Sequence, residues 1–252
     1  MAPAQASKGR VPLSRALSKL GILSRTQAAE AICAGRVRVD GRVVRDPLRP
    51  VVPERARIDV NGRERTRARW QTIVLHKPRG VVTTRRDPEG RRTIYDVVGE
   101  DGDGLVAVGR LDLASTGLLI LTSDTQLANW ITDPANAVSR VYLVTVRGEV
   151  TSDAVAALPA ARVVVRKRSA RETHLTVELT QGRNREIRRM FEAIGREVTR
   201  LKRVRVGGLE IGDLQPGMWR AISRDELFRA FPAWAARSER PTRSAFGSAP
   251  KS

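Results

Sequence analysis

The sequence has 252 residues and a formal net charge of +19, because 46 lysines and arginines outweigh 27 acidic residues. The length suits one large domain or two smaller ones, and 41% hydrophobic residues are enough for a core. Cations are spread along the chain, which favours nucleic acid as the partner, since Lys and Arg displace counterions from phosphates. Without an apolar run of about 18 residues or a signal segment, we expect a cytoplasmic protein with no membrane contact.

The cysteine and histidine content argues against metal chemistry. Cys33 is the single cysteine, so no internal disulfide or thiolate cluster forms within one chain, and His76 and His174 lie far apart without ligand-spaced partners. Cys33 falls in a helical apolar pattern, which predicts a buried side chain. The sequence has no P-loop, dinucleotide fingerprint or GxSxG elbow, so we expect neither a metal nor a cofactor, and no serine nucleophile.

The first segment is predicted to be a small basic module. Residues 1–10 are polar and form a disordered lead-in. Within residues 11–62, leucines at helical spacing predict one helix that Gly21 ends, and Ser24 caps a second helix that ends at Gly35. An alternating stretch around Asp40-Gly41 predicts a hairpin, and residues 56–62 predict one more short strand.

The stretch LSKLGILSRTQAAEAICAGRVRVDGRVV in this module resembles the S-four-type RNA-binding domain. The helix start near Ser24 would offer free N–H groups to a phosphate. The alternative is that the cations of the module form only a solvated face. The candidate RNA contacts are Arg15, Lys19, Ser24, Arg25, Arg36 and Arg38.

A charged linker at residues 63–69 separates this module from a longer segment at residues 70–231, and residues 232–252 are expected to be a disordered tail. Strands dominate the longer segment. Apolar or alternating runs lie at residues 71–76, 105–108, 117–122 and 140–147, and two more strands are expected within residues 162–180. Short helices follow at residues 124–133, 151–160, 184–195 and 224–231. The pattern predicts an α+β fold with a mainly antiparallel sheet and flanking helices.

The stretch GRLDLASTGLLILTSD, at residues 109–124, contains the first candidate for chemistry. Asp112 follows one predicted strand and precedes another. Arg110 lies two residues earlier and would point to the same side of an extended chain. The alternative is that Asp112 is an ordinary turn residue.

Two further stretches contain candidate site residues. In QGRNREIRRM, Gly182 permits a turn, Asn184 would cap a helix, and the arginines of its first turns would hold a nearby carboxylate ionised. The alternative is a solvated basic face. Tyr142 lies on an alternating strand, which is typical of a core residue, unless a flipped base stacks on it. The arginines of the basic stretch are Arg183, Arg185, Arg188 and Arg189.

Together with HKPRGVV, SRVYLV and LQPGMWRAIS, these stretches resemble the RsuA/RluB-type pseudouridine synthase family in order and spacing, over nearly all of residues 11–230. The resemblance implies an RNA-modifying enzyme that isomerises uridine. It implies Asp112 as the catalytic aspartate, Tyr142 and Ile187 on the two sides of the uracil, Arg188 paired with Asp112, and Arg110 as the residue that helps to extrude the uridine. The partner would be ribosomal RNA or a ribosomal subunit precursor. We expect a monomer, because the sequence has no leftover apolar stripe that would need a protein partner.

The chain departs from the family pattern at Glu186, Arg140, His76 and Thr125, where Gln, Lys, Asn and Gly are usual. None of these changes the carboxylate. A lone carboxylate suits an isomerisation, whereas hydrolysis of a glycosidic bond requires two. The sequence leaves open whether Asp112 attacks the sugar or the ring.

Two alternatives to the enzyme are a non-catalytic ribosome-assembly protein and a DNA-binding regulator. A DNA-binding regulator would need a recognition helix and a dimerisation element, and the sequence shows neither. The stretch DPEGRRTIYDVV favours a large-subunit ribosomal RNA target, with small-subunit ribosomal RNA as the alternative.

Overall fold

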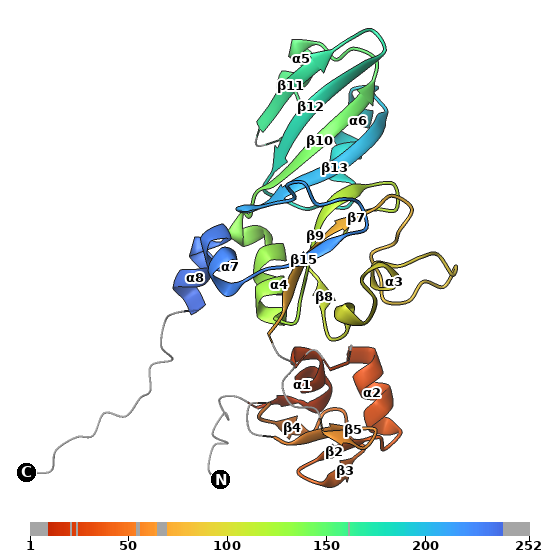
Figure 1. Cartoon of the computed structure of the whole chain (residues 1–252), viewed down its shortest axis with the longest axis vertical. Helices are drawn as coiled ribbons and strands as arrows, with labels where there is room; N and C mark the ends of the chain where they lie inside the picture. The colour runs from red at the N-terminus through yellow and green to blue at the C-terminus, as the bar shows by residue number, and fades with distance from the viewer. Residues whose placement is uncertain are drawn as a thin grey trace, which may run out of the picture.

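A computed structural model describes residues 10–20, 22–23, 25–53, 56–64, 70–160 and 162–238. Most of the expected lead-in, residues 65–69 of the expected linker, and Ser24 lie outside the described residues. So do the side chains of Lys19, Arg63 and Glu64. The described chain forms a small N-terminal module and a larger α+β domain (Figure 1).

The N-terminal module packs two helices with a four-stranded antiparallel sheet, in the order β3-β2-β5-β6, and a two-stranded one, β1-β4. Asp40 and Gly41 have φ angles of 51° and 80°, the left-handed conformations that a tight hairpin requires, so the predicted hairpin is confirmed. One core of aliphatic side chains, including Leu13, Leu17 and Ile32, joins helices and strands. Its elements are β1 (Val11–Pro12), α1 (Leu13–Lys19), α2 (Arg25–Cys33), β2 (Val37–Val39), β3 (Arg42–Val44), β4 (Pro50–Val51), β5 (Ile58–Val60) and β6 (Arg63–Glu64).

Two predictions for this module are wrong. Cys33 is exposed, because the buried face of α2 consists of Ala28, Ala31 and Ile32, and the next residue turns about 100° away. Arg63 and Glu64, expected in the linker, form β6, because their backbones complete a hairpin with β5.

The larger domain is built on a nine-stranded sheet. Its main path runs β11-β12-β10-β13-β9-β7-β15, while β14 pairs with β13 and β8 with β9. The β13–β9 pair is parallel and the other pairs are antiparallel, as predicted for a mainly antiparallel sheet. The strands are β7 (Thr72–Lys77), β8 (Val106–Ala107), β9 (Thr116–Thr122), β10 (Arg140–Arg147), β11 (Arg162–Arg168), β12 (Glu172–Leu179), β13 (Val198–Val206), β14 (Leu209–Glu210) and β15 (Trp219–Ala221).

The helices cover both faces of the central strands. Ile73 and Leu75 of β7 face one core with α3 and α6, whereas Val74 faces a second core with α4, α7 and α8. Burial on both faces explains why the central strands read as unbroken apolar runs. The helices are α3 (Ile94–Val98), η1 (Gly99–Gly102), α4 (Thr125–Thr132), η2 (Pro134–Asn136), α5 (Ser152–Ala156), α6 (Glu186–Ala193), α7 (Arg224–Ala230) and α8 (Pro232–Ser238).

The prediction of a disordered tail at residues 232–252 is wrong for residues 232–238. Residues 232–238 form α8, and Trp234 is buried against the ring of Trp130, with 5.8 Å between the ring centroids. Burying an aromatic side chain in this core stabilises the extra helical turns. The rest of the expected tail, residues 239–252, lies outside the described residues.

Candidate active site

Asp112 lies in a short loop that connects β8 to β9. The loop is fixed on both sides of the aspartate. The Thr83 hydroxyl donates to the Leu111 carbonyl at 2.9 Å, and the Gly80 N–H donates to the Leu113 carbonyl at 2.9 Å. The Ser115 N–H donates to the Asp112 carbonyl at 3.0 Å and closes a turn. The backbone is therefore held while the carboxylate stays partly exposed, with 37% of its side chain accessible.

Lys77 anchors this loop through hydrogen bonds, a role that the sequence did not reveal. It ends β7, is fully buried, and its Nζ donates to the carbonyls of Asp112 at 3.1 Å, Ser115 at 2.9 Å and Pro78 at 3.0 Å. Burial lowers the pKa of Lys77 to about 8, an effect that the nearby Asp112 charge opposes. The one signal in the sequence is a lysine that ends an apolar strand directly before a proline.

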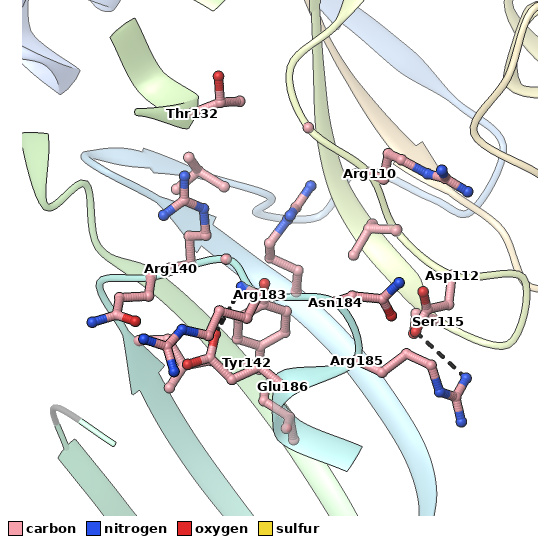
Figure 2. A pocket seen from close by; sticks show the side chains of 18 of the residues that line it. Arg110, Asp112, Ser115, Thr132, Arg140, Tyr142, Arg183, Asn184, Arg185 and Glu186 are labelled. Atoms are coloured by element: carbon pink, nitrogen blue, oxygen red, sulfur yellow. Dashed lines mark hydrogen bonds and ion pairs between the residues drawn. The ribbon is translucent and has the colours of Figure 1, made fainter. Parts of the chain in front are cut away.

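A cavity of about 380 Å³ opens beside Asp112. Tyr142 of β10 and Ile187 of α6 are both buried and line it, so strand and helix bring together the two residues that the sequence proposed for the base. Figure 2 shows Asp112 and Arg185 on one side of the cavity, and Tyr142 with Arg140 and Arg183 on the other. The cavity combines apolar walls, the carboxylates of Asp112 and Glu186, and several cations, which suits a planar base attached to a phosphodiester chain.

The cation paired with Asp112 differs from the expected one. Arg185 Nη1 lies 3.8 Å from Asp112 Oδ2, whereas Arg188 Nη1 donates to the Val198 carbonyl at 2.9 Å. Arg188 forms no ion pair with Asp112 in the described part of the chain, so the predicted pair is wrong for this structure. The two residues remain close enough for the Asp112 charge to oppose the lowering of the Arg188 pKa, which burial causes first and the Arg185 charge second.

The start of α6 also differs from prediction. The helix begins at Glu186, and its N-cap is Arg185 with a φ angle of 49°, so Asn184 is not the cap. Glu186, which departs from the family pattern, accepts a hydrogen bond from the Arg183 N–H at 3.0 Å and so satisfies a backbone donor at the helix start. The left-handed turn at Arg185 directs its side chain toward Asp112 (Figure 2).

The other predicted arginines take different positions. Arg110 and Arg183 are exposed and line the cavity, whereas Arg189 is exposed, lies outside the lining, and bonds the Asn184 carbonyl. In the N-terminal module, the four arginines whose placement is described are all exposed, as a phosphate-binding surface requires. These four are Arg15, Arg25, Arg36 and Arg38.

Two buried arginines line the cavity. Arg140 donates to the Ile131 and Val138 carbonyls at 2.8 Å each, and burial lowers its pKa. Arg203 was not recognised in the sequence. Its Nε donates to the Leu118 carbonyl at 2.7 Å and ties β13 to β9. This approach requires Gly117, whose φ is 111° and where a Cβ would lie 2.1 Å from the Arg203 carbonyl oxygen.

The remaining departures from the family pattern are local. His76 Nδ1 lies 2.6 Å from the Leu214 carbonyl, and burial lowers the His76 pKa. Thr125 is the first residue of α4, whose N-terminal N–H groups are capped by Asp124. Neither residue lines the cavity.

The described residues contain neither a candidate metal site nor a candidate membrane span. No group of three or more His, Cys, Asp or Glu side chains is placed to hold a metal ion there. No helix in that part of the chain is long and apolar enough to cross a membrane.

Comparison with known proteins identifies the class. The RNA pseudouridylate synthase family model matches residues 71–193, and the S4 domain model matches residues 11–55. A crystal structure of a pseudouridylate synthase superposes with a TM-score of 0.61 at 27% identity, covering 87% of this chain and 99% of that one.

Curated relatives narrow the class. An uncharacterized RNA pseudouridine synthase of Aquifex aeolicus is 35% identical over 237 residues, covering 88% of this chain and 94% of the relative. Ribosomal large subunit pseudouridine synthase B of Bacillus subtilis is 32% identical over 231 residues, covering 86% of this chain and 94% of the relative. The Yersinia pestis protein of that name is 36% identical over 216 residues, covering 79% of this chain and 68% of the relative. The chain belongs to the RsuA/RluB-type RNA pseudouridine synthase family with an S4 domain, and it is an isomerase.

Proposed function

We propose that this enzyme isomerises one specific uridine of ribosomal RNA to pseudouridine, with large-subunit ribosomal RNA as the target. The Bacillus subtilis and Yersinia pestis relatives, named as large-subunit synthases, support this choice. The exposed arginines of the N-terminal module would bind the RNA backbone. We propose that the enzyme acts as a monomer in the cytoplasm. Among the described residues, the large apolar side chains that are exposed come from both the N-terminal module and the larger domain: Val43, Leu48, Leu113, Leu143, Val164 and Met218.

One observation carries the proposal: a partly exposed carboxylate borders a cavity lined by a buried aromatic ring and a buried aliphatic side chain. A uracil inside an RNA stack is out of reach of such a cavity, so the uridine must flip out. Flipping costs a few kcal/mol and is easiest in a loop or bulge. Arg110, exposed at the cavity, would fill the gap that the base leaves.

The flipped uracil would lie between Tyr142 and Ile187, with its glycosidic bond next to Asp112. Asp112 would act as the nucleophile: its carboxylate forms a bond to the substrate, and this bond breaks again before the product leaves, so the aspartate is regenerated. The bond between N1 and C1′ breaks, the ring turns, and a bond forms between C5 and C1′. C5 loses its proton and N1 gains one, so the atoms and charges balance without a second substrate. The loop anchors at the buried Lys77 and at Thr83 would hold the carboxylate in place during these steps.

The test is pseudouridine mapping of ribosomal RNA by carbodiimide-stop primer extension. Cells that lack the protein are compared with cells rescued by the wild type or by Asp112→Asn. We expect one large-subunit stop to disappear in the deletion strain and to return only with the wild type. A lost stop in small-subunit RNA would overturn the target, and rescue by the Asn variant would overturn the role of Asp112. If no stop changes, ribosomal RNA is the wrong substrate.

A further inference from the structure

A second groove, of about 510 Å³, lies at the end of the sheet where β10 finishes. Arg147 is the last residue of β10. In the strand register it lies opposite Glu172, at the start of β12, while Val146 lies opposite Val198, at the start of β13. The strand register therefore gathers one end of three strands. Four arginines line the groove, with Glu172 and Thr199 as the other lining residues. They are Arg79, Arg147, Arg171 and Arg200.

The positive charge of this groove is poorly compensated. Arg147 pairs with Glu197 at 3.0 Å, but both side chains are largely exposed, so the pair is weak. The Glu172 carboxylate contacts His174, with 2.9 Å between Glu172 Oε1 and His174 Nε2. Arg79, Arg171 and Arg200 are exposed and form no ion pair within the described ranges. A concave surface with several unneutralised arginines and one acid selects a ligand with repeated negative charges.

One residue of the groove lies near the loop that contains Asp112. Arg79 follows Lys77 and Pro78 in the loop after β7, where the Gly80 N–H donates to the Leu113 carbonyl, and the charge of Arg79 acts on Arg188. Arg188 in turn bonds the carbonyl of Val198, two residues before Arg200. The charges of Arg79 and Asp112 both act on Arg188, so these two arginines lie between the groove and the carboxylate, while the groove and the cavity share no lining residue. A strand whose flipped nucleotide occupies the cavity would pass these cations to reach the groove.

We propose that this groove binds phosphates of the substrate RNA on one side of the flipped uridine. The inference rests on the proposed function, because it assigns the path of the same RNA strand. Sequential phosphates meet separate arginines there, whereas base edges play no part, so the groove contributes affinity and register without sequence reading. RNA is favoured over an acidic protein because the family acts on RNA, whose phosphates repeat along the strand and match a row of separate arginines.

The test uses Arg171→Gln/Arg200→Gln, which removes two exposed cations far from the reacting atoms. The matched control is Arg229→Gln/Arg237→Gln on α7 and α8, which removes the same charge from helices that Figure 1 shows away from the groove. The probe is large-subunit ribosomal RNA transcribed without modification. Binding is measured against salt concentration, and single-turnover and steady-state rates are measured on the same transcript.

We expect the groove variant to bind roughly 10- to 30-fold more weakly at 0.1 M salt, with a log–log salt slope smaller by about 1.4, because each contact to a single strand contributes about 0.7. Its rate at saturating RNA should stay within about twofold of wild type. Equal slopes and affinities in the groove and control variants would overturn the proposal. Weaker binding of an acidic polypeptide but not of RNA would also overturn it, in favour of a protein partner.

Failure of the proposed function is recognised separately. If wild type leaves the transcript unmodified, the proposed substrate is wrong, but the salt slopes still decide whether the groove binds RNA. If wild type modifies the transcript and the groove variant behaves as the control, the groove inference alone fails. Circular dichroism of both variants would show that the fold is retained.

Discussion

The Nζ of Lys77 lies 3.1 Å from the backbone carbonyl oxygen of Asp112 and donates a hydrogen bond to it from a fully buried position. The same ammonium also holds the carbonyls of Ser115 and Pro78. One buried cation thus bonds the loop that presents the carboxylate at Asp112 and Ser115 and links it to Pro78 at the end of β7. Lys77 does not line the cavity, so it acts as a positioning residue.

Lys77→Met should therefore reduce both stability and turnover. The methionine fills most of the volume but removes the ammonium donor from three carbonyls, of which that of Asp112 keeps the Ser115 N–H, so we expect a loss of about 1–3 kcal/mol in the free energy of unfolding. A displaced Asp112 should lower kcat by at least roughly tenfold with a smaller effect on KM. Urea unfolding and steady-state kinetics measure both. Lys167→Met, at an exposed position of β11, is the control and should leave both quantities near wild type.

The stability of the enzyme should depend on pH through the same lysine. Burial lowers the Lys77 pKa in the folded state to about 8, against an ordinary value of 10.5. Between these values the unfolded chain binds more protons at this site than the folded chain does, so its contribution to stability rises as pH rises. We expect wild type to gain up to about 3 kcal/mol over Lys77→Met between about pH 7 and pH 10.5. A pH-independent difference between the two unfolding curves would refute the assignment.

Gly117→Ala should be among the most damaging small substitutions. A Cβ at this position would lie 2.1 Å from the carbonyl oxygen of Arg203, in the parallel pair that joins the two halves of the sheet. We expect a loss of about 4 kcal/mol or more, because backbone on both sides must move. Gly217→Ala is the control. It has a φ of 86° but open space around it, so it should cost only about 1–2 kcal/mol. Equal losses in urea unfolding would show that the contact is unimportant.

The sequence predicted the parts of the site that depend on local patterns. The alternation of β10 predicted that Tyr142, Val144 and Val146 share a buried face, and the structure confirms it. The position of Asp112 between two apolar strands predicted a rigid base for the carboxylate, and β8 and β9 provide it. Periodicity of 2 or 3.6 residues carries this information within one element.

Contacts between distant residues could not be predicted in this way. Lys77 reaches a carbonyl 35 positions later, and Arg203 reaches one 85 positions earlier. Both residues read as ordinary strand cations until the sheet order is known. Asp112 pairs with Arg185 rather than Arg188 because Arg185 takes a left-handed conformation at the helix start. Arginine seldom adopts this conformation, so the sequence did not predict it.

Trp234 tests the correction to the C-terminal boundary. Its ring is buried and packs against Trp130 and the core under α4 and α7. Trp234→Ala should lower the free energy of unfolding by about 3–5 kcal/mol, as for other buried aromatic residues. Met218→Ala, at a side chain that is 58% exposed, should change it by less than about 1 kcal/mol. If both variants unfold at the wild-type urea concentration, α8 is not part of the folded domain.

Double-mutant cycles would decide which arginine pairs with Asp112 in the resting enzyme. Stability is measured for Asp112→Asn, Arg185→Gln, Arg188→Gln and the two doubles. The pair of Asp112 with Arg185 spans 3.8 Å and both side chains are partly exposed, so we expect a coupling of about 0.2–1 kcal/mol that shrinks with added salt. Arg188 donates to Val198 instead, so its coupling to Asp112 should be smaller.

Removing Arg188 should still cost more stability than removing Arg185, because the Arg188 guanidinium is more buried and its loss takes a donor from the Val198 carbonyl. A larger, salt-resistant coupling between Asp112 and Arg188 would restore the ion pair that the family resemblance implied, and Arg185 would then be free to contact RNA.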